Sequence, residues 1–233
     1  MIGKKMIIIS IMFVFMILTL SGCTQQDTSE ETLSLDKPDD KTDPPEIESL
    51  HTILSKTEFI ESIYYEIDAS IYMSEFGSQS ANIKIWEKNP YLKEQITSTI
   101  DDVTTKITVI ERPGGIYMYD SKLGKYMPAT EEVTSISTSL QYFDNEIIKN
   151  YVGNYTLDDF ETDIIDGKKA TIIQYSPSEG EYPMTIKLWI WNEKGLPLKA
   201  YINMTMKDFT MEMDFVFMDY SFLDIPDSTF SIS

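Results

Sequence analysis

The stretch from Ile202 to Met218, INMTMKDFTMEMDFVFM, decides the fold, because apolar residues occupy every second position on both sides of a short polar break. Such alternation is typical of a strand that has one buried face. Lys207 and Asp208 interrupt it, so the stretch predicts two antiparallel strands joined by a tight turn. Met218 falls on the opposite parity, and Asn203 is expected to face water. The predicted inward side chains are Ile202, Met204, Met206, Met211, Met213, Phe215 and Phe217.

Shorter segments with the same alternation precede this hairpin along much of the chain. Strands are expected near residues 65–73, 81–85, 92–100, 103–109, 116–120, 125–127, 160–165, 168–175 and 184–190, with a last edge strand in 225–233. Turn sequences such as 76–79, 112–115 and Asp166-Gly167 separate them. This pattern predicts an antiparallel meander. The other predicted inward side chains are Ile67, Ile71, Ile83, Ile85, Ile96, Ile107, Ile186, Leu188 and Ile190.

Two segments instead show helical spacing. Residues 136–151 place apolar side chains, Leu140 and Phe143 among them, on one face of a predicted helix of about five turns. Residues 47–63 predict a shorter helical segment, in which Ser55 could begin a capping box. His51 lies there and is read as a surface residue. The fold class is therefore α+β, mainly antiparallel β.

The N-terminus has the organisation of a secretory signal. Lys4 and Lys5 precede an apolar run that ends in Leu20-Ser21-Gly22-Cys23. These residues resemble the lipobox of prokaryotic lipoproteins, which implies cleavage of residues 1–22 and lipidation of Cys23. The alternative is an uncleaved anchor helix. Residues 23–46 are acidic and rich in proline, so they predict a lipidated cysteine followed by a disordered tether, and residues 47–233 form the folded domain.

Composition excludes several classes of function. The formal net charge of −19 argues against binding to nucleic acid. One His and one Cys leave almost no candidates for a nucleophile paired with a base, and no phosphate-binding or dinucleotide-binding glycine motif occurs. We therefore expect no enzyme activity, no catalytic residue, no cofactor and no metal site.

Several phrases resemble the LolA/LolB-like superfamily of lipoprotein carriers. KNPYLKEQ followed by GGIYMYDSKLGKYM, and later KLWIWNEKGLPLKAYI followed by DYSFLDIPDSTFSI, are similar to that family's two halves. The resemblance covers roughly residues 47–233. It implies a strongly curved, open half-barrel sheet with helices on its concave side, where a lipid, an acyl chain or another hydrophobic molecule is held. The chain differs from the family in its arginine. The carriers use an arginine on a strand, whereas Arg112 lies in a Pro-Gly-Gly turn, so we do not assign the family arginine's role to Arg112.

The resemblance and the lipobox together place the domain at the outer face of the cytoplasmic membrane, held by its N-terminal lipid. We expect the cell to be an archaeon or a Gram-positive bacterium rather than one with a Gram-negative periplasm. The expected partners are a lipid or lipoprotein acyl chain and the membrane itself, with a protein partner also open.

The role of the methionines stays open at this stage. Their flexible, polarizable side chains suit either a filled core or a cavity shared with a lipid. The filled core corresponds to a protein-interaction or sensor lipoprotein. Thioethers also favour Cu(I), which makes copper a third, weaker alternative. Two glycosylation sequons, at Asn154 and Asn203, fit chance occurrence better than use.

Overall fold

The computed structural model describes residues 49–75, 77–100, 103–129, 148, 160–176, 183–205 and 209–232. The predicted signal segment and tether, Cys23, Asn154 and Met206 lie outside these residues, as does the predicted 136–151 helix apart from Ile148. Ile148 is helical and fully buried. Within the described residues, no helix is long and apolar enough to cross a membrane.

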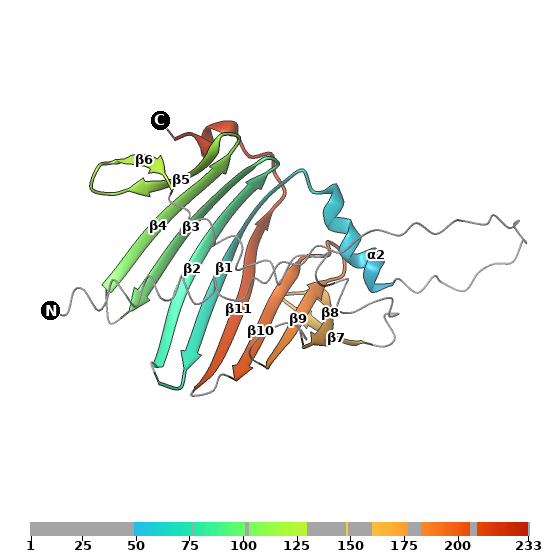
Figure 1. Ribbon diagram of the computed structural model, residues 1–233. Helices are drawn as coiled ribbons and strands as arrows, with labels where there is room; N and C mark the ends of the chain where they lie inside the picture. The colour runs from blue at the N-terminus through green and yellow to red at the C-terminus, as the bar shows by residue number, and fades with distance from the viewer. Residues whose placement is uncertain are drawn as a thin grey trace, which may run out of the picture.

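The described chain forms one open antiparallel sheet of eleven strands in the order β6-β5-β4-β3-β2-β1-β11-β10-β9-β8-β7 (Figure 1). The strands are β1 (Ser62–Met73), β2 (Gly77–Lys88), β3 (Tyr91–Ile100), β4 (Val103–Arg112), β5 (Gly115–Asp120), β6 (Lys125–Pro128), β7 (Glu161–Ile165), β8 (Lys168–Tyr175), β9 (Met184–Trp191), β10 (Pro197–Thr205) and β11 (Thr210–Ser221). Two meanders, β1–β6 and β7–β11, thus meet where the first strand pairs with the last. This confirms the predicted fold class of a mainly antiparallel, open half-barrel.

The two faces of the sheet are distinguished by burial. We call the inner face the side on which the main apolar cluster lies, with Ile67 on β1, Phe217 on β11 and Leu188 on β9. Residues paired directly across antiparallel strands point to the same face, so the register assigns every strand position. For example, Ile67 pairs with Phe217 on one side and with Ile83 on the other.

The short helix α2 (Leu50–Ser55) packs against the sheet at the β9–β10 turn. Its buried side chains, Leu50, Ile53 and Leu54, belong to the inner-face cluster. The Ser49 hydroxyl caps it by accepting a hydrogen bond from the Thr52 amide. The predicted capping box at Ser55 is wrong, because Ser55 makes no capping bond and the chain continues directly into the 3-10 turn η1 (Lys56–Phe59).

The first hairpin turn and the C-terminus also differ from the predictions. β2 begins at Gly77, so the turn lies earlier than residues 76–79 and Gln79 belongs to the strand. The C-terminal segment is no edge strand. It forms the 3-10 turn η5 (Asp227–Phe230), and Phe230 packs with Ile110 on the outer face of the sheet. In such a short tail, the alternation of apolar and polar residues does not distinguish a strand from an irregular segment that buries one or two side chains.

We expect Phe230→Ala to lower the free energy of unfolding by about 3–4 kcal/mol, because only 1% of this side chain is exposed. Leu223→Ala is the control, since Leu223 is 78% exposed and its loss should change stability by less than about 0.5 kcal/mol. Urea unfolding measures both. Similar values for the two variants would contradict the packing of the tail on the sheet.

The close approach of α2 gives a second prediction. Gly195 adopts φ 72°, and a methyl group there would lie 2.3 Å from the Ile53 carbonyl oxygen. Gly195→Ala should therefore cost more than about 2 kcal/mol, the sum of left-handed strain and a backbone clash.

Gly167→Ala is the matched control, because Gly167 has φ 76° but open space around it. Left-handed strain alone should cost about 1–2 kcal/mol. Thermal unfolding compares the two variants, and equal losses would mean that α2 does not press on the β9–β10 turn.

Candidate functional site

Four methionines form one continuous row across the inner face. Met73 on β1 pairs with Met211 on β11, Met211 pairs with Met204 on β10, and Met204 pairs with Met184 on β9. All four are buried. We call this set the methionine row. It joins the two meanders at the end of the sheet that carries the β1–β2 hairpin.

The apolar inner face continues from this row toward the opposite end of the sheet. Met213 and Phe215 follow on β11, and the core then extends along β9 and across β1 to β3. The sequence-predicted residues that are buried are Ile67, Ile71, Ile85, Ile96, Ile186, Leu188, Ile190, Ile202, Met204, Met211, Met213, Phe215 and Phe217. Ile83 and Ile107 are half-buried. Leu140, Phe143 and Met206 lie outside the described residues.

The inner face is covered rather than open to water. Leu50, Ile53 and Leu54 of α2, together with Ile148, belong to the same cluster as the sheet residues. Any apolar ligand would therefore have to lie among these covering groups or displace some of them. Because methionine changes conformation easily, such repacking costs less here than in a core of branched side chains.

Aromatic rings close the end of the inner face near α2. The register between β1 and β11 shifts between Tyr64 and Glu66, and Asp219 adopts φ 54°. This irregularity brings Tyr220 onto the inner face, where its ring stacks on Tyr65 at 5.4 Å. The Tyr220 hydroxyl donates a hydrogen bond to the Pro197 carbonyl oxygen. Burial raises the pKa of both tyrosines, so they stay neutral.

One carboxyl lies deep in this apolar surface. Glu94 on β3 is only 3% exposed, and its cross-strand partners are Ile85 and Val109. Burial, and then repulsion from Glu111, raises its pKa to about 7. No lysine or arginine of the described residues forms an ion pair with it. The sequence did contain the signal, because Glu94 has the same parity as Leu92 and Ile96.

Gln79 is the second buried polar residue on this face. It pairs with Ile71, next to the methionine row, and its Oε1 atom is buried with no hydrogen-bond partner. An unpaired buried acceptor is costly in a folded protein. Gln79 was not predicted as a site residue because its segment was expected to form a turn. Met73 and Met184 lie in the predicted strands 65–73 and 184–190 but were not among the predicted inward residues.

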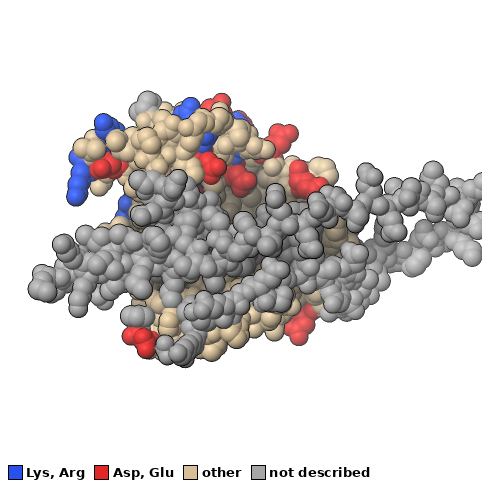
Figure 2. Space-filling model, in the orientation of Figure 1, with Lys and Arg blue, Asp and Glu red and all other residues tan. Residues whose placement is uncertain are grey.

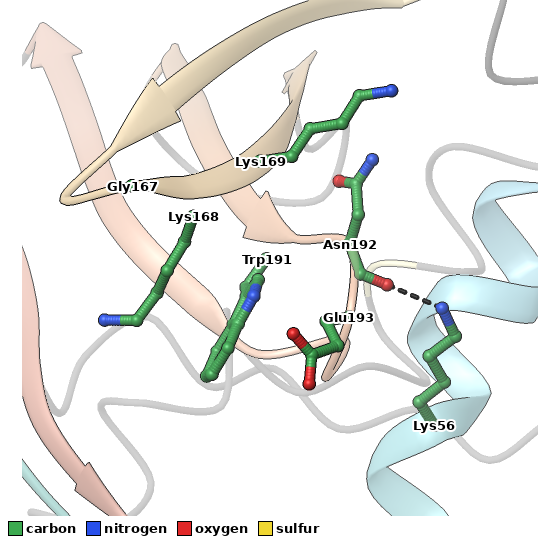
Figure 3. Close-up of a pocket in the computed structure, with 7 residues that line it drawn as sticks. All are labelled: Lys56, Gly167, Lys168, Lys169, Trp191, Asn192 and Glu193. Carbon is green, nitrogen blue, oxygen red and sulfur yellow. Dashed lines mark hydrogen bonds between the residues drawn. The ribbon is translucent and has the colours of Figure 1, made fainter.

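A pocket of about 330 Å³ lies beside α2, between the β7–β8 hairpin and the β9–β10 turn (Figure 3). Lys56 donates a hydrogen bond of 2.6 Å to the Asn192 carbonyl oxygen, and Lys168 lies over the Trp191 ring. Figure 3 shows the ammonium groups of Lys56 and Lys168 on opposite sides of Trp191. Because these charges do not converge on one point, the pocket fits a role in attaching α2 better than a role in binding an anion.

The described residues offer little other site chemistry. They contain no group of three or more His, Cys, Asp and Glu side chains arranged to hold a metal ion. His51 is exposed on α2, as its surface assignment predicted. Asn203 lies on the outer parity of β10 and is half-buried, with its amide donating to the Tyr201 hydroxyl at 3.3 Å.

Comparisons with known proteins find similarity in structure only. No protein-family model matches the sequence. No curated protein matches it either. Among solved structures, a LolA superfamily protein from Nitrosomonas europaea matches 78% of this chain and 97% of its own, with 12% identity and a TM-score of 0.39.

Two further structures show the same level of likeness. A chain of the Pseudomonas aeruginosa MucA/MucB complex matches 79% of this chain with 12% identity and a TM-score of 0.46, and this chain spans 61% of that one. An uncharacterized conserved protein from Thermus thermophilus matches 76% of this chain and 90% of its own, with 6% identity and a TM-score of 0.45. At this level of identity the likenesses concern the fold alone and say nothing about what the chain binds.

The environment of Glu94 predicts a pH-dependent stability. Its pKa is about 7 in the folded chain against 4.5 for an ordinary glutamate, so between these values the folded state holds a proton that the unfolded state has lost. The stability that the folded chain gains by binding this proton is therefore fully present below pH 4.5 and is lost as the pH rises through 7. We expect Glu94→Gln to be about 3 kcal/mol more stable than the native chain at pH 8 and similar to it at pH 4.5.

Glu212→Gln is the control for this experiment, because Glu212 is exposed on the outer parity of β11. The measurement is the difference in unfolding free energy between each variant and the native chain across pH 4.5–8.5. A difference for Glu94→Gln that does not change with pH would contradict the burial of an unpaired carboxyl.

Proposed function

We propose that this chain is a non-catalytic binding protein that holds an apolar molecule, such as a lipid or an acyl chain, on the inner face of its sheet. The methionine row is the observation that carries the proposal. Four adjacent strands each contribute a flexible thioether at the same level of the sheet, and this surface can reshape around a guest. Gln79 supports it, because its buried unpaired oxygen lies beside the row.

The proposal includes attachment to the outer face of the cytoplasmic membrane through a lipid on Cys23. The lipobox-like residues Leu20-Ser21-Gly22-Cys23 support this step. A diacyl anchor would keep the domain at the surface, since each buried methylene contributes about 0.8 kcal/mol. The ligand would then be collected from, or delivered to, this same membrane. Metabolic labelling with a radioactive fatty acid tests the anchor, and label retained by Cys23→Ser would contradict it.

A second function is favoured by the burial of the inner face. The sheet residues, α2 and Ile148 already form one packed cluster. If that cluster is complete, the domain is a protein-interaction or sensor module whose core is filled by its own side chains. One of the structurally similar chains belongs to the MucA/MucB complex, an assembly of two proteins.

The decisive experiment is to express residues 24–233 and analyse the purified protein by native mass spectrometry and by organic extraction. We expect an extractable apolar molecule, together with rebinding of a fluorescent fatty acid after extraction. A protein of unmodified mass that excludes the probe would contradict the carrier function and support the filled core. Stoichiometric copper in the purified protein would instead support the metal alternative.

The double variant Met204→Leu and Met211→Leu separates lipid from copper. Leucine keeps the volume and apolar character of methionine but cannot ligate a soft metal. We expect binding of the fluorescent fatty acid to change by less than about threefold, within the usual cost of such exchanges. Loss of probe binding with retained folding would contradict a purely apolar role for the row, and loss of bound copper would identify the thioethers as ligands.

A further inference from the structure

Glu94 is the polar group of the inner face that the proposed function does not explain. It lies on the same parity of β3 as Leu92 and Ile96, with Ile85 and Val109 beside it on the neighbouring strands. A carboxyl that keeps only 3% of its surface exposed has lost its hydration. An apolar residue at this position would pack against the same neighbours without that cost.

The charged and titratable groups that face Glu94 are acidic or neutral. Glu87 on β2, Glu111 on β4 and Tyr65 on β1 occupy the same face. Tyr65 pairs with Ile85, and Ile85 pairs with Glu94, so the register places the tyrosine and the carboxyl near one another. Burial first, and then the negative charges of Glu87 and Glu94, raise the pKa of Tyr65. Glu87 is exposed at the rim of this face, and partial desolvation raises the pKa of its carboxyl. Among the described residues, no ion pair involves Glu87, Glu94 or Glu111.

The chain as a whole has the same sign of charge, with a formal net charge of −19. On the face drawn in Figure 2, Lys and Arg gather toward the end that carries the β5–β6 hairpin, and acidic side chains lie along the upper rim and the lower edge. This field favours the approach of a cation and opposes that of an anion.

We propose that the ligand of the inner face is a cationic amphiphile, whose protonated amine pairs with the Glu94 carboxylate while its tail lies among the apolar side chains. The inference rests on the proposed function and adds to it the charge of the ligand and the residue that selects it. An amine supplies both the positive charge and the hydrogen-bond donors that Glu94 lacks. Glu87 and Glu111 strengthen the attraction without contacting the tail.

The test uses the full-length chain in a neutral, non-ionic detergent. Two photoreactive probes with the same alkyl chain are compared, one ending in a primary amine and the other in an alcohol. After irradiation, intact mass gives the fraction of protein labelled by each. At pH 8 we expect the amine to label about tenfold more than the alcohol, the effect of one charge-assisted hydrogen bond.

The variants assign this preference to one residue. Glu94→Gln keeps the shape of the side chain and should bring the ratio of amine to alcohol labelling close to one. Glu212→Gln, on the outer face, should leave the native ratio unchanged. In the native chain the preference should fall as the pH drops below 7 and Glu94 takes up a proton.

The outcomes separate this inference from the proposed function. Equal labelling by the two probes in the native chain, competed by excess apolar ligand, would overturn the cationic preference and leave the carrier function standing. Labelling by neither probe above background would overturn both. A preference for the amine that survives in Glu94→Gln would overturn the role of Glu94.

Discussion

The pairing of β1 with β11 holds the whole structure together. Each meander is built from neighbours in sequence, but these two strands come from opposite ends of the domain and pair along most of their length. Without this ladder there would be two smaller sheets, each with an exposed central edge. With it, Met73 meets Met211, the methionine row becomes continuous, and the apolar side chains of both halves form one cluster. The inner face is therefore a product of long-range pairing rather than of either meander.

Alternation predicted the strands well because a half-buried strand must alternate. The segments 168–175 and 184–190 correspond closely to β8 and β9. The errors fall where burial does not follow the polarity of the residue or the strand period. The first hairpin turn was predicted too late in the sequence because Gln79 is polar yet buried. The tail was predicted as a strand, but its 3-10 turn buries one side chain, Phe230, on the outer face. Sequence parity also cannot reveal which strands adjoin, so the methionine row could not be seen before the β1–β11 register was known.

The site was predicted in its apolar part and missed in its polar part. Carboxylates on strands usually face water, and Glu94 was not named among the inward residues although its parity placed it inward. Its burial costs stability that an apolar residue would not. Gln79 presents the same departure from core packing at the other end of the face. Residues that oppose stability in this way are concentrated at functional sites, because selection for binding maintains them.

The position of β1 in the sheet also has a consequence for synthesis. β1 is the first strand to emerge, and β2 can pair with one of its edges at once, but the other edge has no partner until β11 is complete at the end of the chain. Contacts of such high sequence separation make folding slow. During synthesis, the edge of β1 that pairs with β11 stays open until the last strand has been made. This interval is when the chain is most exposed to aggregation and proteolysis, and when a chaperone would have the greatest effect on yield.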